Sequence, residues 1–270
     1  MKRSERVVAI LKTLMDRPSS VLPLGHFASQ LDAAKSTISE DVSLIRETLN
    51  RLKSGTLETI AGATGGVRYF PTRDVSVTGT LVNELCQALS KPDRVLPGEF
   101  VYMTDIVFSP VWASLIGEVF ATRYREAGAQ YVLTVETKGI PVALSTARCL
   151  GVPLVVCRRD AMATEGPAVS INYVSGSSRR IQTMSLPKRA LSQGARVLVV
   201  DDFMKGGGTA KGMMELVAEF GAKTVGTAVL IEMAEPSKKL VSDYFSLAIL
   251  QSVDDANRKI DIRPSPRIAS

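Results

Sequence analysis

The most chemically informative stretch of the sequence joins two carboxylates to a glycine-rich loop. An apolar run at residues 197–200 leads into Asp201 and Asp202. The loop that follows contains Lys205, Gly206, Gly207, Gly208 and Thr209. Glycine N–H groups and a helix start favour a phosphate, and the hydroxyl of Thr209 adds a donor. Carboxylates repel phosphate, so Asp201 and Asp202 suit the vicinal hydroxyls of a sugar, or a divalent metal and its waters. The stretch predicts a site for a phosphorylated ribose.

A second candidate anion site is Glu136-Thr137-Lys138-Gly139, directly after the apolar run at residues 131–135. Lys138 and the backbone around Gly139 offer a cation and N–H groups to a second anionic group. Taken alone, a Lys-Gly turn after a strand also fits an ordinary surface bend. Two such turns in one sheet favour the binding interpretation.

The elements that must position these residues alternate between strands and helices. Apolar β-type runs lie at residues 101–103, 131–135, 153–157, 197–200 and 224–231. Helical patterns lie at about 111–126, in the segment ending at 150, and at 209–220. Strands that are buried on both faces and joined by crossover helices form a parallel α/β sheet. Ligands of such sheets bind beyond the carboxyl ends of the strands, where both candidate anion sites stand.

The first seventy residues follow a different pattern. Apolar spacing predicts helices at about residues 4–15, 24–31 and 36–52. A Gly-rich turn at 61–66 separates two β-type runs at 56–60 and 67–70. Three helices followed by a hairpin are the order of a winged helix-turn-helix, in which the third helix enters the major groove of DNA. A small three-helix interaction module is the alternative.

Small, polar or cationic side chains open the predicted third helix. They are Lys35, Ser36, Thr37 and Ser39. The residues expected to turn inward are Ile38, Val42, Ile45, Leu49 and Leu52. The polar side chains suit phosphates and base edges. Ser36 with Ser39 and Glu40 also resembles a capping arrangement, so the hydroxyls fit either DNA contact or the completion of a helix end. In the hairpin, Arg68 is expected to face phosphate.

Length and composition limit the interpretations that are open for both parts of the chain. With 270 residues, the chain exceeds the size that one core usually serves, and the pattern changes after residue 73, which predicts domains at 1–73 and 74–270. A net charge of +6 favours a polyanionic partner. The three cysteines predict buried thiols, and the single histidine excludes most histidine-based metal sites. No apolar run suits a membrane span and the N-terminus lacks a signal-peptide pattern, so we expect a cytoplasmic protein.

Three segments of the second part carry a family resemblance. Residues 197–209 resemble the phosphoribosyl pyrophosphate motif of type I phosphoribosyltransferases, and residues 136–139 resemble their pyrophosphate loop. Residues 170–186 occupy the place of their flexible hood loop. Nearly the whole chain, including residues 35–41 and 62–67, resembles the purine operon repressors of Gram-positive bacteria. The resemblance implies an α/β protein in which an N-terminal winged helix-turn-helix domain precedes a type I phosphoribosyltransferase-like parallel-sheet domain.

The resemblance also implies roles for individual residues. The implied ligands of ribose and the 5-phosphate are Asp201, Asp202 and residues 205–209. The implied pyrophosphate ligands are Thr137, Lys138 and Gly139. Tyr102 and Phe203 would flank a base, although either side chain fits the core equally well. No cofactor is expected to be obligatory, and Mg²⁺ is expected to accompany bound phosphoribosyl pyrophosphate.

Departures from the enzyme pattern favour a sensor over a transferase. Working enzymes have small residues and then Thr-Gly-Gly-Thr in the phosphate loop, whereas Lys205 and Gly206 precede Gly207 here. Phe203 and Met204 offer neither acid nor base to a purine. The resemblance implies a transcription repressor that binds phosphoribosyl pyrophosphate as an inducer and lacks transferase activity. The alternatives are an active purine phosphoribosyltransferase with an appended DNA-binding domain, and a module that binds a protein partner through its basic face.

The expected partners are double-stranded DNA, phosphoribosyl pyrophosphate and a second copy of the chain. A DNA-facing surface or a solvated face accounts for the basic residues Arg158, Arg159, Arg179, Arg180, Lys188 and Arg189. A homodimer interface or core accounts for the apolar residues Trp112, Leu115, Ile116, Val119 and Phe120. The tail at 257–270 is expected to add an edge segment or to fray. The resemblance further implies that a guanine-nucleotide alarmone competes for the ligand site.

Overall fold

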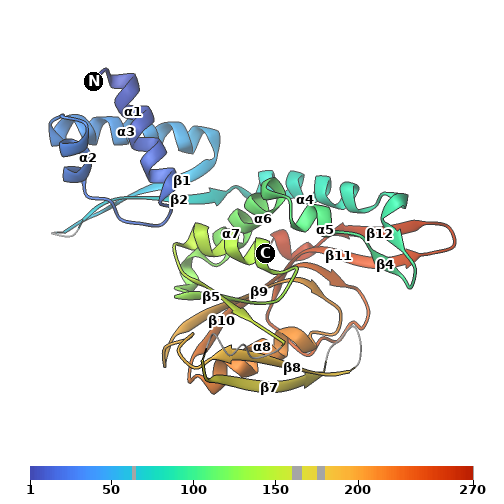
Figure 1. Ribbon diagram of the computed structural model, residues 1–270. Helices are drawn as coiled ribbons and strands as arrows, with labels where there is room; N and C mark the ends of the chain where they lie inside the picture. Colours follow the sequence, from blue (N-terminus) through green and yellow to red (C-terminus); the bar gives the residue numbers. More distant parts are fainter. Residues whose placement is uncertain (63–64, 160–165, 175–179, 270) are drawn as a thin grey trace. The chain divides into compact units, whose positions relative to one another are not determined.

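The computed structural model describes residues 1–62, 65–159, 166–174 and 180–269, and the chain divides into two compact units (Figure 1). Met1–Asp74 and Arg148–Gly151 belong to the first unit, and Val75–Ala147 and Val152–Ser270 belong to the second. Each unit has its own cluster of buried apolar side chains. The main division follows Asp74, one residue after the expected joint.

The first unit consists of three helices and a hairpin. Its helices are α1 (Arg3–Asp16), α2 (Leu24–Gln30) and α3 (Lys35–Leu52), and its strands are β1 (Ser54–Ile60) and β2 (Gly66–Arg73). The two strands pair antiparallel, and Leu22 forms a short bridge to Val67. This order confirms the predicted sequence of helix, helix-turn-helix and hairpin. Residues 63 and 64 of the predicted turn lie outside the described residues.

The spacing of apolar residues explains how α3 packs in this unit. The positions buried at intervals of three or four residues are Ile38, Val42, Ile45 and Leu49. Leu52 was expected to turn inward as well, but it is 64% exposed. It ends the helix beside Lys53, whose left-handed backbone conformation (φ 52°) turns the chain away from the helix axis. The opposite face of α3 is left to its polar residues.

The second unit is built on a six-stranded sheet with the strand order β12-β11-β10-β9-β5-β6. Its strands are β5 (Tyr131–Val135), β6 (Leu154–Cys157), β9 (Arg196–Met204), β10 (Lys223–Met233), β11 (Phe245–Asp254) and β12 (Lys259–Pro264). All neighbouring pairs are parallel except β12, which pairs antiparallel with β11 at the edge. The predicted α/β class is confirmed, and the sheet is mixed and mostly parallel.

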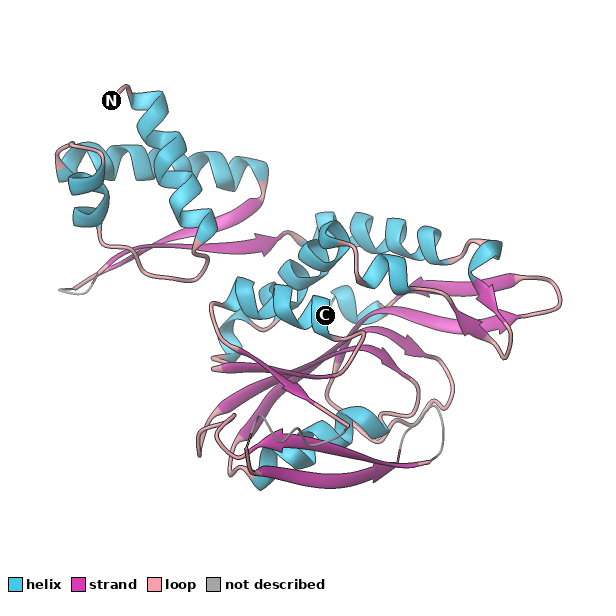
Figure 2. Cartoon of the chain, viewed as in Figure 1, coloured by secondary structure: helices cyan, strands magenta, loops and turns pink. Residues whose placement is uncertain are grey.

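Helices lie on both faces of this sheet (Figure 2). They are α4 (Val75–Leu89), α5 (Thr104–Val107), α6 (Pro110–Arg123), α7 (Ile140–Leu150) and α8 (Gly208–Glu219). Short 3₁₀ turns are formed by Pro92–Arg94, Arg125–Ala127 and Pro266–Ala269. Within the described ranges, none of the helices combines the length and apolar character needed to cross a membrane.

A hairpin outside the main sheet packs against α8. Its strands are β7 (Ala168–Val174) and β8 (Ile181–Pro187), which pair antiparallel (Figure 1). The close approach needs Gly212 of α8, because an added Cβ there would lie 3.0 Å from the Cβ of Tyr173. The hairpin occupies most of the segment expected to be a flexible hood loop. Residues 175–179 of that segment, including Arg179, lie outside the described residues.

Three other features of the second unit differ from the sequence-based expectation. The run predicted at residues 101–103 as a strand of the sheet is a strand only at Val101, because β4 (Phe100–Val101) pairs with β3 (Val95–Leu96) in a separate ribbon. Helix α4 and strand β11 were not predicted.

The tail was expected to add an edge segment or to fray, and β12 confirms the edge segment.

The three cysteines are buried, as predicted, and the described part of the chain contains no disulfide. Burial raises the pKa of Cys86 to about 11. Burial and the charge of Asp201 raise the pKa of Cys157 to about 12. Both thiols are therefore protonated at neutral pH.

Candidate functional site

The strand order brings two strand ends together at one edge of the sheet. β5 and β9 are parallel neighbours, with β6 beyond β5 and β10 beyond β9, so the direction of winding changes between them. Ligands of open α/β sheets bind at such a switch point, outside the carboxyl ends of the strands. The end of β5 leads to Lys138, and the end of β9 carries Asp201 and Asp202. Both predicted anion sites therefore belong to one site.

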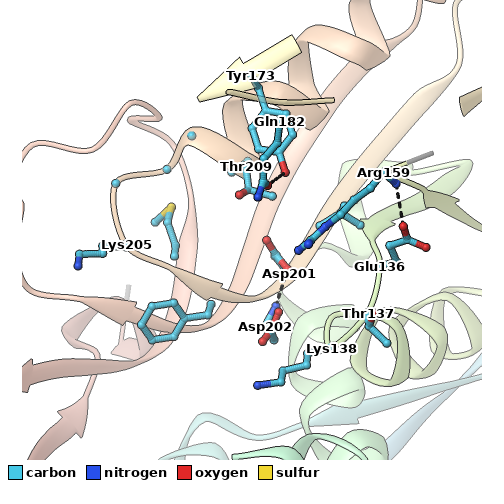
Figure 3. Close-up of a pocket in the computed structure, with 17 residues that line it drawn as sticks. Glu136, Thr137, Lys138, Arg159, Tyr173, Gln182, Asp201, Asp202, Lys205 and Thr209 are labelled. Atoms are coloured by element: carbon cyan, nitrogen blue, oxygen red, sulfur yellow. Dashed lines mark hydrogen bonds between the residues drawn. The ribbon is translucent and has the colours of Figure 1, made fainter. Parts of the chain in front are cut away.

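A pocket of about 400 Å³ opens at this switch point (Figure 3). Its lining residues are Val135, Glu136, Thr137, Lys138, Arg159, Tyr173, Gln182, Asp201, Asp202, Phe203, Met204, Lys205, Gly206, Gly207, Gly208, Thr209 and Ala210. All predicted ligand-binding residues line it except Tyr102 and Gly139.

Asp201 and Asp202 form an adjacent pair of carboxyl groups in the pocket. Asp201 is 5% exposed, and its Oδ1 accepts a hydrogen bond of 2.9 Å from the backbone N–H of Asp202. Burial, reinforced by the charge of Asp202, raises the pKa of Asp201 well above its usual value. Burial also raises the pKa of Asp202, against the opposing effects of a hydrogen bond with Asp201 and the charge of Lys138. Hydroxyl donors or a cation would stabilise the ionised pair.

The glycine loop ends at an uncapped helix start. Gly207 precedes α8 with φ 82°, a left-handed conformation that favours glycine. No side chain caps α8, so the N–H groups of its first turn remain available in the pocket. The helix dipole favours an anion at this position, and Thr209 lies beside it.

Gly139 does not line the pocket, but it packs closely against Asp201, which does. An added Cβ at this position would lie 2.3 Å from Thr134 Oγ1 and 3.1 Å from Asp201 Oδ1. The loop after β5 can approach Asp201 so closely because residue 139 has no side chain. Among the described residues, the buried Thr134 Oγ1 finds no hydrogen-bond partner.

Sequence reasoning did not assign Arg159, Tyr173 and Gln182 to the pocket. Arg159 follows the end of β6, and its backbone N–H donates to Glu136 Oε1 over 2.7 Å. Tyr173 and Gln182 face each other across the β7–β8 hairpin. The Tyr173 hydroxyl donates to Gln182 Oε1 (2.8 Å), and the side chain of Thr209 is also hydrogen-bonded to Tyr173. The strand-end rule could have found Arg159, whereas the other two depend on the register of the hairpin.

A second cavity of about 220 Å³ adjoins the pocket and has largely apolar walls. The two cavities share Lys138, Asp202, Phe203 and Lys205. The other lining residues are Gly98, Glu99, Phe100, Val101, Met103, Ile231, Met233, Leu250 and Ile262. Tyr102 is not among the lining residues of either cavity, and its side chain is 43% exposed. The aromatic residues that the structure brings to the second cavity are therefore Phe100 and Phe203.

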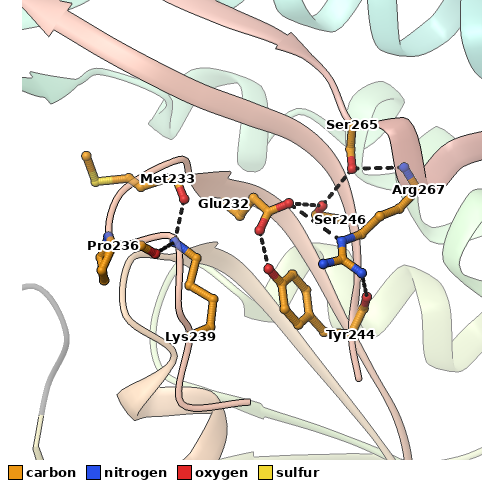
Figure 4. Close-up of polar contacts among 8 residues, drawn as sticks. All are labelled: Glu232, Met233, Pro236, Lys239, Tyr244, Ser246, Ser265 and Arg267. Atoms are coloured by element: carbon orange, nitrogen blue, oxygen red, sulfur yellow. Dashed lines mark hydrogen bonds and ion pairs between the residues drawn. The ribbon is translucent and has the colours of Figure 1, made fainter. Parts of the chain in front are cut away.

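The glycine loop contacts a second loop, residues 233–241, in which Figure 4 shows Met233, Pro236 and Lys239. The backbone N–H of Leu240 donates to the carbonyl oxygen of Gly206 over 2.9 Å. Lys239 Nζ closes the second loop by donating to the carbonyl oxygens of Met233 (2.5 Å) and Pro236 (2.7 Å). The position of Gly206 thus depends on contacts outside the pocket.

The buried carboxylate of Glu232 directly precedes this second loop in the sequence. It accepts hydrogen bonds from the hydroxyls of Tyr244 and Ser246 (2.7 Å for Ser246). Its Oε1 lies 3.8 Å from Arg267 Nε (Figure 4). Burial and the hydrogen bond to Glu232 raise the pKa of Tyr244 to about 12. Tyr244 also packs with Met204, which leads into the glycine loop.

In the first unit, the start of α3 presents polar side chains that do not cap it. The N-cap residue is Ala34, and no side-chain cap is present, so the capping interpretation of Ser36 and Ser39 is wrong. Lys35, Ser36 and Ser39 are exposed, and Thr37 is half-buried. These side chains remain available to a partner.

Arg68 of the predicted wing lies in an ion pair. Its Nη2 and Nε lie 2.8 and 3.2 Å from Glu58 Oε2 on the facing strand. The predicted contact of Arg68 with phosphate would therefore use a partly neutralised guanidinium. Arg46 of α3 donates to the carbonyl oxygen of Leu57 (3.0 Å) and to Thr59 Oγ1 (2.6 Å), which fixes the hairpin against the helix.

Two family models match the chain. The model described as the N-terminal domain of the bacterial purine repressor matches residues 2–71, and the phosphoribosyl transferase domain matches residues 109–261. The purine biosynthesis transcriptional repressor PurR of Bacillus subtilis is 44% identical over 97% of this chain and 92% of that protein. The chain belongs to the bacterial purine repressor family. A relative in this family, PurR of Lactococcus lactis, is 41% identical over 97% of both chains and is named a purine biosynthesis transcriptional activator.

The second unit of this purine repressor family member is also similar to enzymes. Xanthine phosphoribosyltransferase of Lactobacillus delbrueckii is 33% identical over 63% of this chain and 93% of the enzyme. Crystal structures of adenine phosphoribosyltransferase from Rhodothermus marinus and Saccharomyces cerevisiae match with TM-scores of 0.51 and 0.54 and identities of 25% and 22%. The matches cover 62% of this chain and 97% and 98% of those chains. They confirm the predicted phosphoribosyltransferase-like fold.

Proposed function

We propose that the protein is a cytoplasmic, DNA-binding repressor of purine biosynthesis genes, and that phosphoribosyl pyrophosphate weakens its binding to DNA. The observation that carries the proposal is the match along 97% of the chain to a purine biosynthesis repressor. The uncapped polar start of α3 and the pocket at the switch point support the two halves of the proposal.

The pocket offers complementary chemistry to each part of phosphoribosyl pyrophosphate. The start of α8 and Thr209 suit the 5-phosphate. The carboxylates of Asp201 and Asp202 accept hydrogen bonds from ribose hydroxyls. Lys138 and Arg159 supply positive charge for the pyrophosphate, and Thr137 adds a hydroxyl.

Mg²⁺ is proposed to accompany the ligand. Asp201 and Asp202 offer two carboxylates, and burial raises the pKa of each, so a cation beside them would stabilise their ionised forms. Among the described residues, no group of three or more His, Cys, Asp and Glu side chains is placed to hold a metal. Mg²⁺ is commonly held by one or two carboxylates, waters and the phosphates of a ligand, so the pair fits such an ion. The ion would supply positive charge beside the pyrophosphate.

A guanine-nucleotide alarmone is proposed as a competitor for the same site. Its phosphate groups would use the donors of the glycine loop. Its base would enter the adjoining cavity of about 220 Å³, where Phe100 and Phe203 provide aromatic surface. Competition follows because both ligands need the same helix start.

DNA binding is proposed to involve a homodimer, because DNA readers of this type commonly bind paired half-sites. Of the apolar residues considered for a subunit interface, Ile116, Val119 and Phe120 are buried within the second unit and serve as core. Trp112 and Leu115 are half-buried and remain candidates for the interface. The exposed basic residues of the second unit include Arg180, Lys188 and Arg189, which suit a polyanion.

The similarity to xanthine phosphoribosyltransferase supports a second candidate, an active purine phosphoribosyltransferase with an appended DNA-binding domain. We favour a protein without turnover, because its relatives over 97% of the chain are named transcriptional regulators. The two candidates differ in whether pyrophosphate is released when a purine base and phosphoribosyl pyrophosphate are supplied together.

The deciding experiment is a gel-shift titration on DNA upstream of the purine biosynthesis genes, with and without phosphoribosyl pyrophosphate and Mg²⁺. We expect specific binding that the ligand weakens in the wild type but not in Asp202→Ala. Transcription from the same DNA in vitro should fall when protein is added, and a rise would indicate an activator. Absence of specific binding at any salt, with purine-dependent pyrophosphate release, would establish the enzyme instead.

A further inference from the structure

A buried carboxylate of α3 binds two arginines of α1 in the first unit. Asp41 is fully buried (0% exposed). Its Oδ1 accepts a hydrogen bond from Arg3 Nε (3.2 Å), and its Oδ2 accepts one from Arg6 Nε (2.8 Å). One negative charge is thus shared by two guanidinium groups, so the cluster keeps a net positive charge.

The two arginines differ in how much of each guanidinium is left for a partner. The side chain of Arg6 is 13% exposed, and its Nη1 donates to the carbonyl oxygen of Met1 (3.2 Å). The side chain of Arg3 is 59% exposed. Within the described part of the chain, Arg3 uses only its Nε, on Asp41. Since a guanidinium has five N–H donors in a planar fork, four donors of Arg3 remain available.

The location of the cluster suits a phosphate beside the major groove. Asp41 follows Lys35 by six residues on α3, which corresponds to about 9 Å along the helix axis. The Nε of Arg3 lies 3.2 Å from Asp41 Oδ1, which keeps the guanidinium beside this part of α3. The major groove is about 12 Å wide and is bordered by phosphates, so a helix lying in it has phosphates within a comparable distance of its flanks. A guanidinium held by its Nε on a carboxylate also keeps its terminal nitrogens in one orientation.

We propose that Arg3 is a DNA phosphate-binding residue and that Asp41 is the positioning residue that orients its guanidinium. The proposal rests on the proposed function as a DNA-binding protein and adds a contact from α1 to those expected from α3 and the hairpin. Arg6 shares the carboxylate but serves to hold α1 on α3.

The test compares three Arg→Gln variants that lose the same charge. Binding to operator DNA is measured by fluorescence anisotropy between 50 and 200 mM salt, with thermal melting of each protein. Arg3→Gln should weaken binding about five- to tenfold at 100 mM salt and reduce the slope of log K against log salt by about 0.9 for each chain bound, with an unchanged melting temperature. Arg6→Gln should lower the melting temperature. Arg51→Gln, at the exposed far end of α3, should leave the slope unchanged.

Asp41→Asn separates orientation from net charge. This variant makes the protein more positive, so a purely electrostatic attraction would strengthen DNA binding. The proposal instead predicts weaker binding, with a salt slope like that of Arg3→Gln. If Arg3→Gln had the same salt slope as the wild type, the role proposed for Arg3 would be overturned and the proposed function would stand. Failure of the wild type to bind operator DNA specifically would overturn the proposed function, and this inference with it.

Discussion

Gly139 lies directly against Asp201: a Cβ added to the glycine would lie 3.1 Å from Oδ1 of the carboxylate. The loop after β5 and the acidic pair at the end of β9 therefore cannot move independently. A substitution at Gly139 should therefore alter the position of Asp201, although the two residues are far apart in the sequence.

Gly139→Ala should weaken binding of phosphoribosyl pyrophosphate by more than about tenfold, because the added methyl group must displace Thr134 or Asp201. Overpacking of this kind costs about 1–3 kcal/mol of stability. Calorimetric titration and urea unfolding measure the two effects. Gly79→Ala in α4 is the control, since a Cβ there meets nothing within 4 Å. Wild-type affinity in Gly139→Ala would show that the loop adjusts freely.

The acidic pair should make the stability of the ligand-free protein depend on pH. Because the folded pKa of Asp201 is raised, the folded protein binds more protons than the unfolded chain above the ordinary aspartate pKa. Stability should therefore fall as pH rises from about 4 through the raised pKa. The stability of Asp201→Asn should not show this decline. In the wild type, Mg²⁺ should bind more tightly as pH rises over the same range. Parallel urea-unfolding profiles of wild type and Asp201→Asn would contradict the prediction.

Removal of the buried carboxylate of Glu232 should destabilise the folded protein. Glu232→Ala leaves the buried hydroxyl of Tyr244 without its acceptor and removes one of the acceptors of Ser246, which predicts destabilisation by about 1–3 kcal/mol. Urea unfolding measures it. Asp261→Asn, which breaks the exposed pair with Arg263, should have no measurable effect. Equal stability of Glu232→Ala and wild type would mean that solvent replaces the network.

The hairpin contact of Tyr173 should contribute to ligand affinity. Tyr173→Phe removes the hydroxyl that binds Gln182 and Thr209, and Thr209 lines the pocket at the start of α8. We expect phosphoribosyl pyrophosphate to bind about fivefold more weakly, which is the usual worth of one hydrogen bond. Tyr131→Phe is the matched control, because within the described ranges its hydroxyl is hydrogen-bonded to Ser192 alone (3.4 Å) and Tyr131 does not line the pocket. The same loss in both variants would remove the special role of Tyr173.

Neutralising Glu58 should strengthen DNA binding. Glu58→Gln removes the charge that holds Arg68, which frees the guanidinium for phosphate. Affinity for operator DNA should rise several-fold, and the salt slope should become steeper by up to about 0.9 for each chain bound. Gel shifts at several salt concentrations measure both. An unchanged slope would show that Arg68 does not meet the DNA backbone.

The parts of the fold that could be predicted are those in which local sequence and position in the sheet agree. Residues 197–200 are apolar because β9 is buried on both faces, and Asp201 follows because a strand end is where polar groups reach a ligand. The spacing in α3 likewise follows from one buried face.

The remaining parts depend on long-range pairing. Tyr173 and Gln182 enter the pocket only because β7 and β8 pair in one particular register on α8. The run at residues 101–103 was predicted as a strand of the sheet, but β4 ends at Val101 and pairs with β3, outside the sheet. Ser36 and Ser39 resemble a cap, yet the helix begins one residue earlier, after Ala34. In each case a neighbour distant in the sequence, or a small shift of a boundary, decides the outcome.

The burial of all three cysteines has a practical consequence for labelling. Maleimides react with the thiolate, and Cys86 and Cys157 are both inaccessible and protonated at neutral pH, while Cys149 is likewise buried. A cysteine introduced at the exposed Asn50 of α3, outside the residues expected to contact DNA, would then be the one thiol open to a dye, with every native cysteine left in place. A fluorophore at that position would report arrival on and departure from DNA in real time, in the otherwise unaltered protein.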